Sequence, residues 1–166
     1  MTGQKRKSKI LDVGAGVFPH PRATHAVDAI NKKSVYNVSK KDFDEYKQDY
    51  KNEYNRSLER KLKSLNYKFG INYNTQRLPY PNNSFDKIYS NGSLGTYGKL
   101  HAFKEVFRIL KHGGKLEYGS INGTKKELET KLKIPAAAGF VNIRPVGIIK
   151  ESQTKFIIVT VVAKKP

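Results

Sequence analysis

Two glycines separated by one residue follow a short apolar run near the start of the chain. Residues 9–13 have the composition of a buried strand, and Gly14, Ala15 and Gly16 come directly after it. Glycine allows a tight turn and a close approach of the backbone to a ligand. Because open α/β sheets bind ligands at the carboxyl ends of their strands, the pattern Asp12-x-Gly14-x-Gly16 predicts such a sheet, with a binding loop after its first strand.

An acidic residue follows the next strand along the chain. Residues 25–28 are predicted to form that strand, and Asp28 stands at its end, sixteen residues after Asp12. A carboxylate in this place can accept hydrogen bonds from both ribose hydroxyls of an adenosine. The glycines together with Asp28 therefore predict a nucleoside site.

The stretch between the glycines and Asp28 is short for a strand–helix–strand unit. Residues 17–27 contain Pro19 and Pro21, and two prolines so close together argue against a normal helix. We therefore expect the first helix of the fold to be missing or reduced to a turn.

Strands and helices are predicted to alternate along the rest of the chain, which indicates a doubly wound, mostly parallel α/β sheet. The last two strands are joined by a short turn at 150–153, which predicts a C-terminal antiparallel hairpin at an edge of the sheet. The expected strands after Asp28 are 68–73, 85–90, 115–120, 141–148 and 155–163, and the expected helices are 100–110 and 125–132.

A change of composition at residues 31–66 predicts a Lys-rich helical insert within a single domain that spans residues 1–166. Apolar residues recur there every three or four positions, as on one face of a helix. The tyrosines among them are either the buried face of this helix or a platform on which bases stack. The stripe consists of Phe43, Tyr46, Tyr50, Tyr54, Leu58, Leu62 and Leu65.

Charge is the strongest global feature, since 32 Lys and Arg against 14 Asp and Glu give a formal net charge of +18. A field of this size favours nucleic acid, RNA above all, or an acidic protein partner, although a solvated lysine-rich surface has the same composition. The excess is mostly lysine, which suits attraction to phosphates better than the bidentate reading of bases.

Several classes of site are excluded by composition. The chain has no cysteine, which removes disulfides, thiolate nucleophiles and cysteine metal sites. No two histidines stand four residues apart, so no metal site is predicted. No apolar run is long enough to span a membrane, and the basic start lacks a secretory signal. We expect a cytoplasmic protein, with a secreted effector domain as the alternative.

Three motifs resemble class I S-adenosylmethionine-dependent methyltransferases. Residues 9–16 match the first motif of this family, 78–90 resemble its loop and fourth strand, and 103–116 resemble a helix, a Lys-x-Gly-Gly turn and the fifth strand. The resemblance covers nearly the whole chain except the insert at 31–66. It implies a Rossmann-like fold and S-adenosylmethionine as the cofactor.

The resemblance also assigns roles to individual residues. Gly14 and Gly16 would line the methionine end of the cofactor, with Asp12 near its amino group and Asp28 on its ribose. An amide, Asn74, stands where many members have an acidic residue that contacts the adenine amino group. The expected cofactor-binding residues are Asp12, Gly14, Ala15, Gly16, Asp28, Ile30, Asn74 and Ser90, and the expected catalytic residues, in the acceptor pocket, are Asn91 and Tyr97.

Two departures from the family pattern bear on the substrate. Residues 91–94 read Asn-Gly-Ser-Leu rather than the Asn-Pro-Pro-Tyr that is typical of methylation on the exocyclic amine of adenine. The compressed glycine loop, with a proline soon after it, resembles methyltransferase-type domains of bacterial polymorphic toxins.

These features predict methyl transfer from S-adenosylmethionine to RNA or to a ribosome-associated acceptor. One alternative is a non-catalytic basic module that binds nucleic acid or an acidic protein. Another is the effector domain of a polymorphic toxin, whose partner would be an acidic immunity protein.

Overall fold

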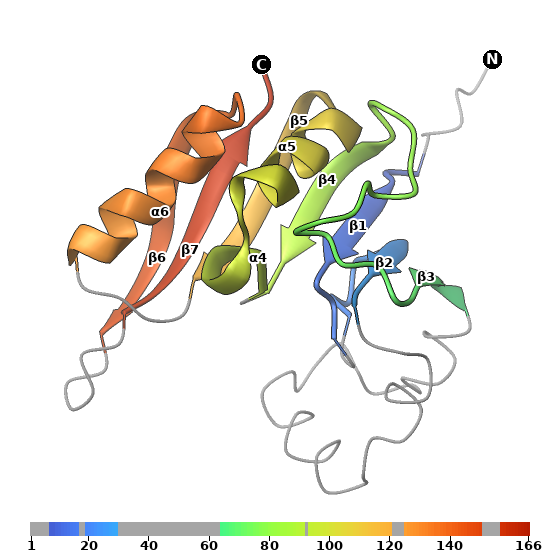
Figure 1. Cartoon of the computed structure of the whole chain (residues 1–166), viewed down its shortest axis with the longest axis horizontal. Helices are drawn as coiled ribbons and strands as arrows, with labels where there is room; N and C mark the ends of the chain where they lie inside the picture. Colours follow the sequence, from blue (N-terminus) through green and yellow to red (C-terminus); the bar gives the residue numbers. More distant parts are fainter. Residues whose placement is uncertain (1–6, 17–18, 30–63, 92, 121–124, 151–156) are drawn as a thin grey trace, which may run out of the picture.

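The strands that the structure describes form one seven-stranded sheet in the order β3-β2-β1-β4-β5-β7-β6 (Figure 1). The computed structural model describes residues 7–16, 19–29, 64–91, 93–120, 125–150 and 157–166. The strands are β1 (Ile10–Val13), β2 (His25–Val27), β3 (Asn66–Lys68), β4 (Phe85–Ser90), β5 (Leu110–Ser120), β6 (Val141–Lys150) and β7 (Ile157–Lys164). The described helices are α4 (Ser93–Tyr97), α5 (Leu100–Ile109) and α6 (Lys125–Ala137).

The pairing of the strands confirms the predicted doubly wound, mostly parallel sheet. β1 pairs in parallel with β2 and β4, β3 joins β2, and β5 joins β4. β7 runs antiparallel to both β5 and β6, so β6 is the edge strand. The predicted antiparallel hairpin is therefore confirmed, with its second strand inserted between β5 and the edge.

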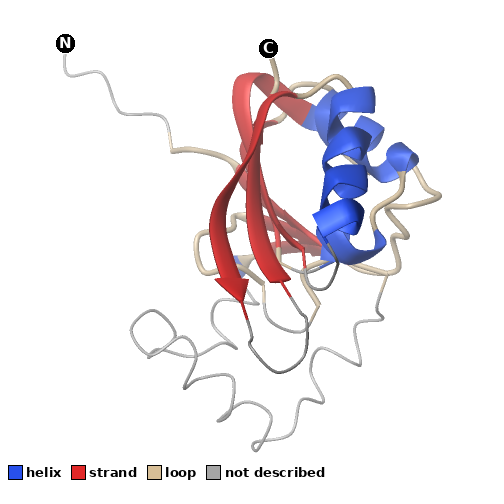
Figure 2. Cartoon of the chain, turned by 90° about the vertical axis from the view of Figure 1, so that its left-hand side faces the viewer, coloured by secondary structure: helices blue, strands red, loops and turns tan. Residues whose placement is uncertain are grey.

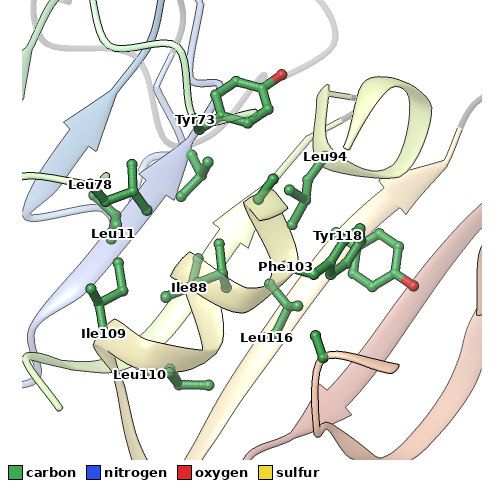
Figure 3. Close-up of a cluster of buried hydrophobic side chains, with 14 of the residues drawn as sticks. Leu11, Tyr73, Leu78, Ile88, Leu94, Phe103, Ile109, Leu110, Leu116 and Tyr118 are labelled. Carbon is green, nitrogen blue, oxygen red and sulfur yellow. The ribbon is translucent and has the colours of Figure 1, made fainter. Parts of the chain in front are cut away.

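Helices α5 and α6 lie on the same face of the sheet (Figure 2). Four side chains of α5 are buried against β4 and β5: Ala102, Phe103, Val106 and Ile109. Their spacing of three and four residues places them on one side of the helix. Burial of an apolar side chain of this size contributes about 1.5–3 kcal/mol, so this core fixes the helix on the sheet (Figure 3).

Several predicted boundaries were wrong. The third strand is β3 at Asn66–Lys68 rather than 68–73, because Gly70 has a positive φ of 71° and ends the extended run. A short helix that was not predicted, α4, follows β4, and its Leu94 N–H donates to the Ser90 hydroxyl. Helix α6 extends past the predicted end at residue 132 to Ala137, with Pro135 inside its last turn.

The region after the glycines has no described helix, as predicted. In residues 14–16 and 19–24 the chain forms only turns and bends. The predicted helical insert at 31–66 lies almost entirely outside the described residues, and it stays a prediction. Within the residues that the structure describes, no helix is long and apolar enough to cross a membrane.

A buried lysine ties the end of the chain to helix α5. Lys165 is 6% exposed, and its ammonium group donates to the carbonyl oxygens of Phe107 at 3.0 Å and Leu110 at 2.9 Å and to Asn83 Oδ1 at 2.9 Å. The last carbonyl groups of a helix have no partner within the helix, and a cation there also suits the helix dipole. Lys165, directly after β7, therefore supplies the C-terminal cap of α5.

Replacement of this lysine is expected to destabilise the fold. Lys165→Met removes the donor and leaves two helix-end carbonyl groups without it, which costs about 2–3 kcal/mol in the free energy of unfolding. Urea unfolding measures this loss. The matched control is Lys164→Met, because Lys164 is exposed and such a change stays within about 0.5 kcal/mol. Equal losses in the two variants would show that the cap does not stabilise α5.

Candidate cofactor site

The glycine turn after β1 is attached to the end of β2. The Gly14 N–H donates to the carbonyl oxygen of Val27 at 2.8 Å, and the Gly16 N–H donates to Asp28 Oδ2 at 2.8 Å. Gly14 and Gly16 have φ angles of 69° and 57°, a region in which side chains are disfavoured. The two glycines predicted from the sequence are thus required by the backbone, and the predicted carboxylate of Asp28 holds their turn.

The first predicted carboxylate shapes the loop that follows the turn. Asp12 is 2% exposed, and its Oδ2 accepts a hydrogen bond of 2.6 Å from the His20 N–H. The His20 ring stacks on Tyr89 of β4 with 3.6 Å between centroids and 8° between planes. Nδ1 of His20 accepts from the Arg22 N–H at 3.1 Å, so in the neutral ring the proton is on Nε2. In this arrangement the His20 ring accepts a hydrogen bond through Nδ1 and its backbone N–H donates to Asp12, so the residue fixes the loop after the turn.

A tyrosine of β3 completes the support of the turn. The Tyr67 hydroxyl donates to the carbonyl oxygen of Gly16 at 2.5 Å, and its ring stacks on Phe69. Burial raises the pKa of Tyr67, and the carboxylates of Asp28 and Asp12 raise it further. The hydroxyl therefore stays protonated and keeps its role as a donor.

The two glycines have different surroundings. A Cβ atom on Gly14 would lie 2.2 Å from the Ser93 hydroxyl oxygen, whereas one on Gly16 would have nothing within 4 Å. The Tyr73 hydroxyl is hydrogen-bonded to the same Ser93 oxygen, and Figure 3 shows Tyr73 extending toward α4. Gly14 is therefore covered by the start of α4, and the turn is open at Gly16.

The predicted acceptor side lies around α4. Ser90 is buried and caps this helix through the Leu94 N–H, at 2.8 Å. The Asn74 amide group accepts from the Lys99 N–H at 2.8 Å and donates to the carbonyl oxygen of Tyr97 at 3.1 Å. The Asn74 amide therefore holds the segment after α4 in place. Tyr97 itself is 69% exposed.

The structure groups the predicted residues in two sets. Around the glycine turn lie Asp12, Gly14, Ala15, Gly16 and Asp28, with Ala15 buried in a small cluster against Ala23, Ala26 and Leu65. Around α4 lie Asn74, Ser90, Asn91 and Tyr97. Ile30 lies outside the described residues, so its proposed contact with adenine stays a prediction.

Three residues of the site were not identified from the sequence. Tyr67 escaped notice because the third strand was placed too late in the chain, although its two-residue spacing from Phe69 is typical of aromatics on one face of a strand. Tyr73 and Ser93 become neighbours of Gly14 only through the tertiary fold. No local pattern indicates that contact.

A nucleoside cofactor fits the open part of this turn. The space at Gly16 lies beside Asp28, whose carboxylate is fixed at the end of β2. Backbone of this kind at the carboxyl edge of a parallel sheet is where doubly wound folds bind nucleotides. No group of three or more acidic or histidine side chains that could hold a metal ion occurs within the described ranges.

Comparison with known proteins agrees with this geometry. The family model described as a methyltransferase domain matches residues 11–117. A comparison with curated proteins gives no match.

Solved structures of the same fold include several methyltransferases. A possible histamine N-methyltransferase of Thermotoga maritima is 17% identical, with a TM-score of 0.60 over 98% of this chain and 84% of that one. Phosphoethanolamine N-methyltransferase 2 of Haemonchus contortus, in complex with S-adenosyl-L-methionine, is 15% identical, with a TM-score of 0.61 over 99% of this chain and 50% of that one. The [4+2]-cyclase SpnF is 16% identical, with a TM-score of 0.62 over 96% of this chain and 75% of that one.

Alanine at the two glycines is expected to have unequal effects on stability. Both changes place a side chain at positive φ, at a cost of about 1–2 kcal/mol. Gly14→Ala must also displace Ser93, so its loss in the free energy of unfolding should be the larger. Urea unfolding of the two variants measures the difference.

Ser93→Gly is the control for this steric explanation. It removes the two nearest atoms that the new Cβ would meet, Oγ and Cβ of Ser93. Combined with Gly14→Ala, it should therefore recover the extra free energy of unfolding that Gly14→Ala loses. If Gly14→Ala and Gly16→Ala are equally stable, the close contact with Ser93 is not present in solution.

Proposed function

This chain belongs to the methyltransferase domain family, whose model matches residues 11–117 of its 166, and from this premise we propose that it methylates RNA or a ribosome-associated acceptor. The expected class I S-adenosylmethionine-dependent methyltransferase is confirmed by the family match together with the fold. S-adenosylmethionine is accordingly the cofactor.

The residues around the glycine turn are proposed to bind the cofactor. Gly16 leaves room for it, and the Asp28 carboxylate, which accepts from the Gly16 N–H at the end of β2, would accept from the ribose hydroxyls. Asp12 and Tyr67 hold the turn in shape by their bonds to the His20 N–H and the Gly16 carbonyl group. A preformed turn lowers the entropic cost of binding.

Methyl transfer needs little from the protein beyond alignment. Bound S-adenosylmethionine would supply a methyl group on a positively charged sulfur, so that an acceptor nucleophile could bond to the methyl carbon as the carbon–sulfur bond breaks and S-adenosylhomocysteine leaves. The chain would hold the two reactants in line and exclude water, and such positioning contributes up to about 7–11 kcal/mol in favourable cases. Asn91, which precedes α4, and Tyr97, the last residue of α4, are the proposed acceptor-side residues.

The net charge of +18 is the observation that carries the proposal of RNA. Such a field attracts polyanions and raises their rate of association. Some of the similar structures are named for small-molecule acceptors, such as phosphoethanolamine. These names describe the acceptors of those proteins and not the acceptor of this chain.

A non-catalytic binding module is the second candidate. It is favoured by the contact of Ser93 and Tyr73 with Gly14, which covers the part of the turn where the methionine end of the cofactor is expected. The same fold also occurs in a protein named for cyclase activity. A fold of this kind therefore does not fix the reaction.

Transfer of a labelled methyl group from S-adenosylmethionine to RNA tests the proposed function. The wild-type chain should label total RNA, and Asp28→Ala should bind S-adenosylhomocysteine about 5- to 150-fold more weakly, which corresponds to about 1–3 kcal/mol for unpaired ribose hydroxyls. Calorimetry measures the affinity, and scintillation counting measures the transfer.

Asp86→Ala is the matched control for the loss of a carboxylate. Asp86 lies on β4 away from the glycine turn and pairs with Lys111, so its loss should leave the affinity for S-adenosylhomocysteine unchanged. Binding of RNA without any binding of S-adenosylhomocysteine would replace the enzyme by the binding module. Labelling of protein or small molecules but not of RNA would refute the proposed acceptor.

A further inference from the structure

The face of the sheet opposite α5 and α6 carries a row of lysines. Along β5 and β7, Leu116 and Ala163 are buried in the core that the helices cover. Since side chains alternate along a strand, Lys115 and Lys164 point to the opposite face. These two lysines are directly opposite each other, and Lys87 of β4 is opposite Lys115.

Beside this row the sheet is hollowed by a cavity of about 440 Å³. Its cationic lining residues are Lys115, Lys164 and Arg144, its amide is Asn142, and Val162 contributes apolar surface. We name it the basic cavity. It lies where the pairing of β6 with β7 is irregular, between Val141 and Arg144, and Asn142 there has a φ of 52°.

The cations of the basic cavity are not neutralised by carboxylates within the part of the chain that the structure describes. The nearby Glu117 is already paired with Lys87, with 2.6 Å between Nζ and Oε2. Like charges placed directly opposite each other on neighbouring strands are destabilising. The presence of Lys115 opposite Lys164 beside the basic cavity is therefore better explained by binding of an anionic ligand than by a contribution to folding stability.

We propose that the basic cavity binds a phosphodiester group of single-stranded RNA. The planar guanidinium group of Arg144 matches the oxygens of a phosphate, and the two lysines supply point charges around it. This inference rests on the proposed RNA acceptor and adds to it a place on the protein where the strand is held.

The size and lining of the cavity favour RNA over an acidic peptide. Sites that enclose small ligands have volumes of about 300–1,000 Å³, so the basic cavity has room for a sugar–phosphate unit. Val162 and Ile143 offer aliphatic surface to the sugar. A carboxylate side chain of an acidic peptide would contact only the charges of the two lysines and Arg144, and it would leave the rest of the basic cavity unfilled.

The cavity and the glycine turn are connected through the register of the sheet. Asp12, at the end of β1, lies in one cross-strand row with Tyr89, Glu117, Val162 and Arg144. Four strand spacings separate Asp12 from Arg144, which amounts to about 19 Å. Lys115 and Lys164 are level with Ile10, at the amino end of β1, so an RNA strand held in the cavity must cross the sheet and also run along β1 to reach the edge where the cofactor is bound. Several linked nucleotides span such a path.

Salt-dependent binding of RNA tests this site. The probe is a fluorescently labelled single-stranded RNA without cofactor, and anisotropy gives its affinity at several salt concentrations. The double variant Lys115→Gln with Lys164→Gln should reduce the slope of log K against log salt by about 0.7, because the cavity holds one phosphate and each lost phosphate contact on a single strand accounts for about 0.7. Arg144→Lys should weaken binding because it keeps the charge but loses the planar fork.

The matched control changes two exposed lysines of the helical layer, Lys104 on α5 and Lys133 on α6. Lys104→Gln with Lys133→Gln removes the same charge from the other face and should leave the slope nearly unchanged. The melting temperature of the cavity variant should equal or exceed that of wild type, because the two like charges repel each other.

Three results would contradict the inference. Equal loss of slope in the cavity and control variants would show that only net charge matters, with the proposed RNA acceptor intact. Polyglutamate that competes as well as unlabelled RNA at equal charge would assign the cavity to an acidic protein. Absence of RNA binding by the wild-type chain would refute the RNA acceptor itself, whereas binding of S-adenosylhomocysteine would still show a working cofactor site.

Discussion

The fixed attachment of the glycine turn to the end of β2 is the constraint on which the site depends. Two backbone donors, the N–H groups of Gly14 and Gly16, bind the Val27 carbonyl group and the Asp28 carboxylate. A folded helix after β1 would normally support such a turn, and the described residues there form none. Asp12 and Tyr67 supply the missing support, because they hold the next part of the loop and the Gly16 carbonyl group. The shortened connection is thus compensated by side chains from neighbouring strands.

The fold was largely predictable because its main signals are local. The apolar run before Gly14 and the amphipathic spacing of α5 each indicate one element, and their alternation implies a parallel sheet. Errors arose where tertiary contacts decide the outcome. Helix α4 forms in a glycine-rich stretch because the buried Ser90 hydroxyl caps it. β5 begins at Leu110, whereas the strand was expected only from residue 115 after a Lys-x-Gly-Gly turn, because the chain passes from α5 into the sheet without a loop.

Only the glycine turn of the site and the carboxylate beside it could be predicted from the sequence. Glycine at Gly14 and Gly16 and a carboxylate at Asp28 follow from general requirements of nucleotide-binding turns, and the structure places these residues together. The cover of Gly14 by Tyr73 and Ser93 joins residues about sixty and eighty positions apart in the chain and has no local signature. The row of lysines is similar, since a composition rich in lysine does not show that Lys115 and Lys164 share one face. The register of the strands, rather than the composition, decides which lysines lie together on one face of the sheet.

The central claim is that the turn at Gly14–Gly16 and the carboxylate of Asp28 bind S-adenosylmethionine. The most direct measurement is the change in backbone amide chemical shifts when S-adenosylhomocysteine is added to the isotopically labelled protein. The account predicts that the largest changes occur at Gly16 and Asp28, where the turn is open, with smaller changes at Ser93 as it yields to the ligand. Saturating ligand that leaves these amides unchanged, or that shifts only residues elsewhere on the sheet, would contradict the account.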